Sequence, residues 1–185
     1  TIYYSAKPRM GIYFIRPDKW YPNKPYQIWT QGESEFNHYW FPCYDYPNER
    51  FTTEINVTVR KPYIVISNGS LKEVKESKDG KWRTYSWQMD IPHVSYLVSL
   101  VVGEFTELKA EYDGIPLQYY VQKEDVKNAL RSFQRTPEMM HFFSQKFGIK
   151  YPYSKYAQTV IREFMWSGME NISCLLYTSP SPRDL

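Results

Sequence analysis

Residues 53–59 read Thr53-Glu54-Ile55-Asn56-Val57-Thr58-Val59, so polar and apolar side chains alternate along this stretch. Alternation with a period of two is typical of a β-strand with one buried face. An apolar run, Ile64-Val65-Ile66-Ser67, follows closely and ends at Asn68-Gly69. Because Asn-Gly is favoured in two-residue hairpin turns, the sequence predicts strands here and a hairpin turn at residues 68–69.

Further strand-like runs lie on both sides of this stretch. The clearest are Ile12-Tyr13-Phe14-Ile15, residues 82–87 and residues 97–102, with turn dipeptides such as Asp79-Gly80 between runs. Aromatic residues make up 18% of the chain, and β-strands favour aromatic residues. Residues 1–105 are therefore predicted to form a mainly β domain, either a β-sandwich or a saddle-shaped sheet.

The sequence pattern changes near Phe105, where we place a domain boundary. A strand pair is expected at residues 105–110 and 117–121, joined across Asp113-Gly114. From residue 124 the apolar residues recur at helical spacing, and a strand is expected again at residues 159–161. Residues 106–173 are thus expected to begin a second unit of mixed helices and strands.

Two helices are expected in this second unit. The first is predicted from the helical spacing of Val126, Leu130 and Phe133. The second is predicted to begin with Thr136 as its N-cap, followed by Pro137, and to end at Gly148. Its predicted buried side consists of Met139, Met140, Phe143 and Phe147.

Composition argues against a nucleic-acid partner and against a transmembrane segment. The 23 Lys and Arg residues nearly balance the 20 Asp and Glu residues, so the net charge is only +3 and no nucleic-acid partner is expected. Apolar residues make up 42% of the chain, which is enough for a folded core. The longest apolar run, residues 96–102, is far too short to span a bilayer, so no transmembrane segment is expected.

Residues 174–185 differ in character from the rest of the chain. Residues 174–184 read like the in-frame translation of a transposase sequencing adaptor, so we expect this tail not to be native. The alternative is a natural loop rich in Ser and Pro. The tail shows no hydrophobic periodicity and fits neither of the elements that precede it. Without it, Cys43 stands alone, and the cysteines indicate no redox compartment.

Two segments carry polar groups where packing alone does not require them. They are Thr30-Gln31-Gly32-Glu33 and Gly168-Met169-Glu170-Asn171. In the first, continued strand geometry would project the Gln and the Glu from the same side, so both could face one ligand. In the second, the Gly permits close backbone approach beside a carboxylate and an amide. The alternative interpretation of the first segment is an exposed polar face at a strand end.

No catalytic signature is present. The sequence contains no P-loop, no G-x-S-x-G and no H-E-x-x-H. His38, His93 and His141 lie far apart and no pair has metal-ligand spacing, so none is expected to bind a metal.

Several motifs in order carry a resemblance to a known family. They are residues 29–33, residues 40–50, Ser67-Asn68-Gly69 and Ser167-Gly168-Met169-Glu170-Asn171. From about Gly11 to Ser173 the chain resembles the aminopeptidase N family of zinc metallopeptidases. The resemblance implies that residues 1–105 are the C-terminal part of an N-terminal β-sandwich domain. It also implies that residues 106–173 begin an α+β, thermolysin-like catalytic domain.

The resemblance further implies a substrate-binding site. In the family, the Gln and Glu of T-Q-x-E and the Glu of M-E-N surround the free α-amino group of a peptide. Here these residues would be Gln31, Glu33 and Glu170, and two converging carboxylates would favour a cation between them. The backbone around Gly168 would pair with the substrate and Met169 would line the S1 pocket. The implied substrate-binding set is Gln31, Glu33, Gly168, Met169, Glu170 and Asn171.

The implied activity is removal of single residues from peptides with a free N-terminus. The family binds zinc through H-E-x-x-H and a later Glu. These residues are expected to lie beyond Ser173, so no residue of this chain is expected to bind zinc or act as the base. The chain alone should therefore be inactive.

Three alternatives stay open at this point. A catalytically inactive scaffold relative with the same fold would show erosion of the carboxylates at Glu33 and Glu170. A bifunctional relative of the leukotriene epoxide hydrolase would typically lack the carboxylate at Glu33. A β-sandwich binding module acting alone is disfavoured, because the apolar residues 164–166 would have nothing to cover them.

Overall fold

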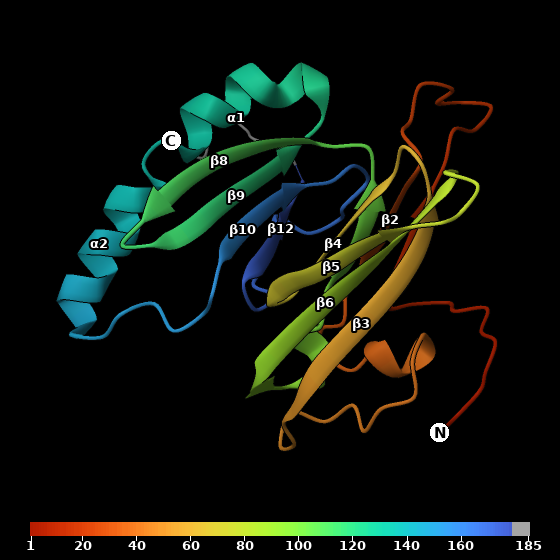
Figure 1. Cartoon of the computed structure of the whole chain (residues 1–185), viewed down its shortest axis with the longest axis horizontal. Coiled ribbons are helices and arrows are strands. Elements are labelled where there is room, and N and C mark those ends of the chain that lie inside the picture. Colours follow the sequence, from red (N-terminus) through yellow and green to blue (C-terminus); the bar gives the residue numbers. More distant parts are fainter. Residues whose placement is uncertain (179–185) are drawn as a thin grey trace.

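The computed structural model describes residues 1–178, which form three β-sheets and two α-helices (Figure 1). The first half contains β1 (Ile12–Ile15), β2 (Gln27–Thr30), β3 (Phe51–Arg60), β4 (Ile64–Ser67), β5 (Ser70–Glu76), β6 (Trp82–His93) and β7 (Leu100–Gly103). The second half contains β8 (Thr106–Tyr112), β9 (Ile115–Val121), α1 (Val126–Phe133), α2 (Thr136–Phe147), β10 (Tyr156–Val160), β11 (Gly168–Met169) and β12 (Cys174–Tyr177).

Two antiparallel sheets make up the first half. Their strand orders are β1-β2-β7-β4 and β3-β6-β5. β3 alternates between half-buried and exposed residues along most of its length, as residues 53–59 predicted. Val65 and Val102 of one sheet and Trp87 of the other lie in one buried cluster. The predicted mainly β fold is confirmed.

The predicted hairpin turn at Asn68-Gly69 was wrong. β4 pairs with β7, whereas β5 pairs with β6, so these two residues carry the chain from one sheet to the other. Gly69 has a φ of +71°, a conformation that glycine adopts without steric penalty. A Cβ at this position would collide with the backbone carbonyl of Gln88. The glycine is therefore required by the approach of β6 as well as by its own φ.

Gly69→Ala should destabilise the chain much more than Gly80→Ala. Gly80 has nearly the same φ, +68°, but a Cβ there would meet nothing within 4 Å. Its substitution should cost only the left-handed backbone penalty, about 1–2 kcal/mol. At Gly69 the collision with Gln88 adds to that penalty. Urea unfolding of the two variants measures the difference, and equal losses would contradict the packing described for Gly69.

The second half is a five-stranded mixed sheet with two helices. Its order is β11-β12-β10-β9-β8, with β8 and β9 joined across Asp113-Gly114 as predicted. β9, β10 and β12 run parallel, and α1 and α2 form the connection from β9 to β10 along the outer side of this sheet (Figure 1). The chain changes sheet between Gly103 and Thr106, and the boundary placed near Phe105 falls in this connection. The predicted mixture of helices and strands is confirmed, while the division into domains stays a prediction.

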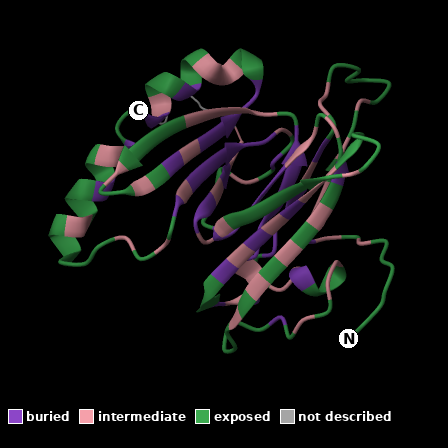
Figure 2. Ribbon diagram, viewed as in Figure 1, coloured by how far each residue is buried: buried purple, intermediate pink, exposed green. Residues whose placement is uncertain are grey.

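The helices bury less apolar surface than their spacing predicted (Figure 2). In α1, Phe133 is buried but Leu130 is 58% exposed. α2 begins at Thr136 itself, with Arg135 as its N-cap, and it ends at Gly148, which has a left-handed φ. Of the four residues predicted to form its buried side, only Met140 is buried. Helical spacing identifies an apolar face, but it does not determine whether another element covers that face.

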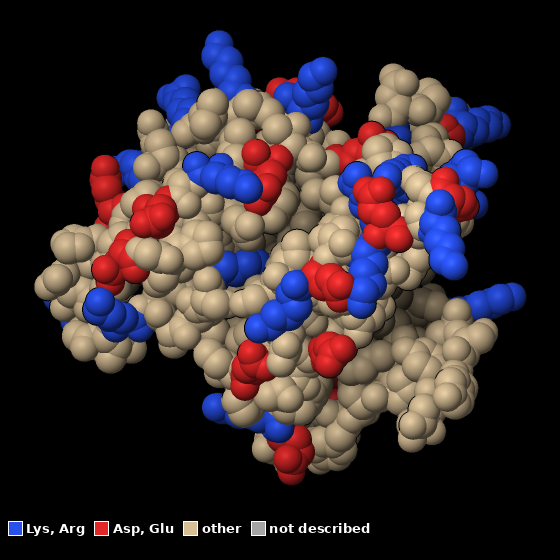
Figure 3. All heavy atoms as spheres, viewed as in Figure 1, with Lys and Arg blue, Asp and Glu red and all other residues tan. Residues whose placement is uncertain are grey.

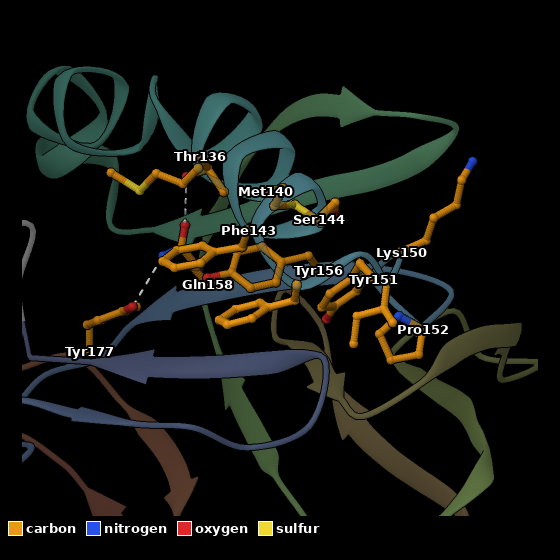
Figure 4. Close-up of a pocket in the computed structure, with 13 residues that line it drawn as sticks. Thr136, Met140, Phe143, Ser144, Lys150, Tyr151, Pro152, Tyr156, Gln158 and Tyr177 are labelled. Atoms are coloured by element: carbon orange, nitrogen blue, oxygen red, sulfur yellow. Dashed lines mark hydrogen bonds between the residues drawn. The ribbon is translucent and has the colours of Figure 1, made fainter.

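The exposed side of α2 borders an apolar groove of about 380 Å³ (Figure 4). The Thr136 hydroxyl donates to Gln158 Oε1 over 3.4 Å, and Gln158 Nε2 donates to the Tyr177 hydroxyl over 3.4 Å. Neither of the two polar segments contributes to its wall. The apolar residues lining it include Met139, Phe143, Phe147, Ile149, Tyr151 and Pro152.

Residues 174–177 form strand β12, although no element was predicted there. β12 pairs with β10 on one side and β11 on the other, and Cys174 and Leu176 are fully buried. A short run that alternates buried and half-buried apolar residues suits a central strand position whatever its origin. The adaptor origin of the tail therefore stays a prediction. Residues 179–185 of this tail lie outside the described residues.

The surface carries mixed charge. On the face drawn in Figure 3, basic and acidic side chains are interspersed over both halves of the chain. Lys61 and Arg83, for example, both pair with Glu76, at 2.8 and 3.0 Å. Among residues 1–178, neither helix has the length and hydropathy that crossing a membrane requires.

Candidate substrate-binding site

The two halves of the chain share a core at the end of β2. Trp29 is 1% exposed; its ring stacks on Tyr13 at 4.4 Å and meets the edge of Phe164 at 5.3 Å. Its Nε1 donates to the Arg162 carbonyl over 3.1 Å, and Arg162 N donates to Gln27 Oε1 over 3.0 Å. These contacts hold the end of β2, where the first polar segment (residues 30–33) begins, against residues 162–164, which lead to the second polar segment (residues 168–171).

The first polar segment leaves the strand before its functional groups. β2 ends at Thr30, and Gln31 N donates to the Gly11 carbonyl over 2.9 Å. Gln31 is buried, at 1% exposed, while Glu33 is exposed. The strand geometry on which the expectation of a shared side depended stops at Thr30, so the common orientation of the two side chains stays a prediction.

The second polar segment lies at the edge of the mixed sheet. Gly168 and Met169 form β11, which pairs only with β12 in the described sheet. Gly168 and Glu170 are exposed, whereas Asn171 is buried. Met169 is 2% exposed and lies in the same buried cluster as Trp29, and its place in the wall of an S1 pocket stays a prediction.

The charges of the two exposed carboxylates both act on one tyrosine. Partial burial raises the pKa of Tyr96, and the charges of Glu170 and then Glu33 raise it further. The two carboxylates that act on this phenol come from distant parts of the sequence. Sequence reasoning missed Tyr96, because it directly precedes the apolar residues 97–102 and looks like part of that run.

Three buried polar atoms on residues close in sequence to Glu33 and Glu170 have no partner among the described residues. They are Gln31 Oε1 and both side-chain atoms of Asn171, each on a residue that is 1% exposed. An unpaired buried polar group costs about 1–3 kcal/mol. A site that leaves such groups unpaired can offer them to a ligand, and Gln31 and Asn171 adjoin the segments that carry Glu33 and Glu170.

A buried lysine bonds to the backbone on both sides of Asn68. Lys155 is 4% exposed, and its Nζ donates to the carbonyls of Ser67 and Gly69 over 2.6 and 2.7 Å. The ammonium also lies 4.5 Å from the ring centroid of Trp87. Burial lowers the pKa of Lys155 to about 8, while the carbonyls and the ring favour its charged form. Sequence reasoning missed this lysine; a single charge between Ser154 and Tyr156 in an aromatic loop was the available signal.

The histidines are dispersed, and none lies in this site. His38 Nδ1 lies 3.0 Å from Asp45 Oδ2, which also accepts the His38 backbone N–H over 2.8 Å. Burial lowers the pKa of His93. Within residues 1–178, no three side chains of His, Cys, Asp or Glu gather closely enough to hold a metal ion.

Known proteins match both halves of the chain. The sequence model of the peptidase M1 N-terminal domain matches residues 1–97, and that of the peptidase family M1 domain matches residues 131–181. Glutamyl aminopeptidase of Bos taurus is 33% identical over 138 residues, which are 74% of this chain and 14% of that protein. The Homo sapiens glutamyl aminopeptidase is 32% identical over the same shares. Puromycin-sensitive aminopeptidase of Caenorhabditis elegans is 27% identical over 149 residues, 80% of this chain and 16% of that protein.

The chain spans only 14–16% of the length of these relatives. The second match runs past Ser173, so residues 174–181 also fall within the family match. Since one family model covers more than half of the chain and the bovine relative is aligned over 74% of it, this chain belongs to the peptidase M1 family of aminopeptidases.

Proposed function

We propose that this chain supplies the amine-recognition residues of a zinc-dependent aminopeptidase that removes single residues from the free N-terminus of peptides. The observation that carries the proposal is that the Glu33 and Glu170 segments are both packed or bonded against residues 95–97, where the charges of both carboxylates act on Tyr96. Two carboxylates at one place repel each other unless a cation lies between them. The α-ammonium group of a peptide is such a cation.

The edge position of β11 supports the same assignment. An extended peptide can add to a free strand edge through main-chain hydrogen bonds. Gly168 is exposed on β11, and Glu170 directly follows this strand. A peptide whose ammonium group is bound by Glu33 and Glu170 would extend from there along β11. This anchoring would fix the register, so only the first peptide bond would reach the reacting group.

Gln31 and Asn171 complete the proposed site. Gln31 Oε1 can accept a hydrogen bond from the ammonium group, and the Asn171 amide can both donate and accept. Each now lacks a partner among the described residues. Substrate binding would therefore remove the cost of leaving them unpaired.

The described residues, 1–178, do not fit a zinc site. No His or Cys among them joins Glu33 or Glu170 in a group that could hold a metal. We therefore propose that the zinc ligands and the general base come from parts of the protein outside this chain. The residues of this chain would bind and orient the substrate, and the chain alone would be inactive.

A catalytically inactive scaffold relative is the second candidate. It would have no need for a cation-binding pair, yet both carboxylates are present and the charges of both act on the same tyrosine. This observation favours the peptidase.

The test uses the whole protein, with its coding sequence read from source DNA past Ser173 without adaptor. We expect an H-E-x-x-H motif followed by a Glu, and hydrolysis of alanine p-nitroanilide that a chelator abolishes. The N-acetylated substrate should show a kcat/KM at least about 100-fold lower, because it cannot form the charged hydrogen bonds. Replacement of the metal ligands, or equal hydrolysis of the two substrates, would overturn the proposal.

A further inference from the structure

A buried asparagine connects the Glu33 segment to residues 95–99. Asn37 is fully buried; its Nδ2 donates to the Ser95 carbonyl over 2.6 Å, and its Oδ1 accepts from Trp40 Nε1 over 2.8 Å. Gly32 leaves room for this contact, because a Cβ there would lie 2.5 Å from Asn37 Nδ2 and 2.7 Å from the Tyr96 carbonyl. The residue next to Glu33 is thus packed directly against Tyr96.

A second buried asparagine connects the Glu170 segment to the same residues. Asn68 is 1% exposed; its Nδ2 donates to the carbonyls of Leu97 and Ile172 over 2.9 and 2.7 Å. Its Oδ1 accepts from Ser99 N over 2.6 Å. The next residue, Gly69, donates its N–H to Ser173 Oγ over 2.9 Å. The Asn68 side chain therefore bonds both to residues 97–99 and to residue 172, and so links these two parts of the chain.

Both asparagines bond to residues 95–99. Asn37 bonds to Ser95, and Asn68 bonds to Leu97 and Ser99. Tyr96 lies between these points. Lys155 bonds to both carbonyls that flank Asn68 and so restrains the turn that presents its amide.

We propose that Asn37 and Asn68 are positioning residues that set the separation of Glu33 and Glu170 by fixing each segment to residues 95–99. This inference rests on the proposed amine-binding role of the two carboxylates. Neither asparagine need contact the substrate, since Asn37 bonds to the Ser95 carbonyl and Asn68 bonds to the carbonyls of Leu97 and Ile172. A buried amide suits this role because it bonds to backbone groups on different segments at once.

The experiment measures the pKa of Tyr96 in the 185-residue chain by NMR with ¹³Cζ-labelled tyrosine, assigned with Tyr96→Phe. In the unmodified chain, Glu33→Gln and Glu170→Gln should each lower this pKa, because each removes a negative charge near the phenol. After Asn37→Ala, Glu33→Gln should have little further effect, while Glu170→Gln keeps its effect. After Asn68→Ala, the reverse is expected. Such cycles isolate the coupling between two residues.

Asn56→Ala is the matched control, since Asn56 is exposed on β3 and should leave both effects unchanged. If an alanine variant fails to fold, Asn37→Ser replaces Asn37→Ala and Asn68→Ser replaces Asn68→Ala. Full additivity in both cycles, or no effect of either Glu→Gln change on Tyr96 in the unmodified chain, would overturn the positioning role.

The amine test on the whole protein separates this inference from the function on which it rests. If the Asn and Glu substitutions are coupled in their effect on the Tyr96 pKa but the enzyme shows no preference for a free amine, the positioning role is supported and the proposed function is contradicted. If the enzyme prefers a free amine but the effects on the Tyr96 pKa are additive, the proposed function is supported and the positioning role is contradicted. In the whole protein, Asn37→Ala and Asn68→Ala should each lower kcat/KM for free-amine substrates by about 10-fold, as expected for one weakened charged hydrogen bond.

Discussion

Glu170→Gln in the whole protein should lower kcat/KM for peptides with a free N-terminus by about 10- to 100-fold. The substitution keeps the size of the side chain but removes the charge that would bind the substrate ammonium group, and a hydrogen bond to a charged group is worth this much. Glu33→Gln should have an effect of similar size. The measurement is steady-state kinetics on an alanine p-nitroanilide substrate.

The control for this prediction is Glu111→Gln. Glu111 is exposed on β8, far along the mixed sheet from β11, and its substitution should leave kcat/KM unchanged. The two site substitutions should also interact. Once one carboxylate is neutral, the ammonium has lost half of its counter-charge, so the double variant should lose less than the product of the single losses. Wild-type kinetics in both single variants would contradict the assignment of these carboxylates.

Trp29→Ala should lower the free energy of unfolding by about 3–5 kcal/mol, the range for removing a large aromatic side chain from a core. The indole is 1% exposed, packs on Tyr13 and Phe164, and bonds to the Arg162 carbonyl. Because a domain is typically stable by only about 5–15 kcal/mol, this loss is a large fraction of the total. Urea unfolding followed by circular dichroism measures it.

Trp20→Ala is the matched control for this substitution. Trp20 is 76% exposed, so its removal should change the free energy of unfolding by less than about 0.5 kcal/mol. Trp29→Ala should also destabilise both halves together, because its ring lies in the core that they share. Unfolding of the second half alone, with the first half unaffected, would contradict this account of the shared core.

Local pattern was sufficient for most strands. The runs at residues 12–15 and 64–67 became β1 and β4 with the same bounds, because alternating or apolar runs of β-branched and aromatic residues encode a strand directly. The partners of those strands were not encoded in the same way. The Asn68-Gly69 pair predicted that β4 and β5 would pair with each other, but β4 pairs with β7 and β5 pairs with β6.

Burial was less predictable than secondary structure. The spacing along α2 identified Phe143 and Phe147 correctly as one apolar face, yet 51% and 67% of these side chains are exposed. For strand β12 the error had the opposite sign, since no buried element was predicted there, yet the segment forms a strand between β10 and β11. Whether a face is covered depends on elements that are distant in sequence, which no local window contains.

Local sequence pattern predicted the mainly β first half and the mixed second half, and the T-Q-x-E and M-E-N motifs predicted that Glu33 and Glu170 belong to a substrate-binding site. The tertiary structure was needed to show that the charges of both carboxylates act on Tyr96 and that Asn37 and Asn68 connect their segments to residues 95–99. Periodicity and motifs are properties of neighbouring residues. A buried amide, in contrast, acquires its role from backbone carbonyls that folding brings to it from remote segments.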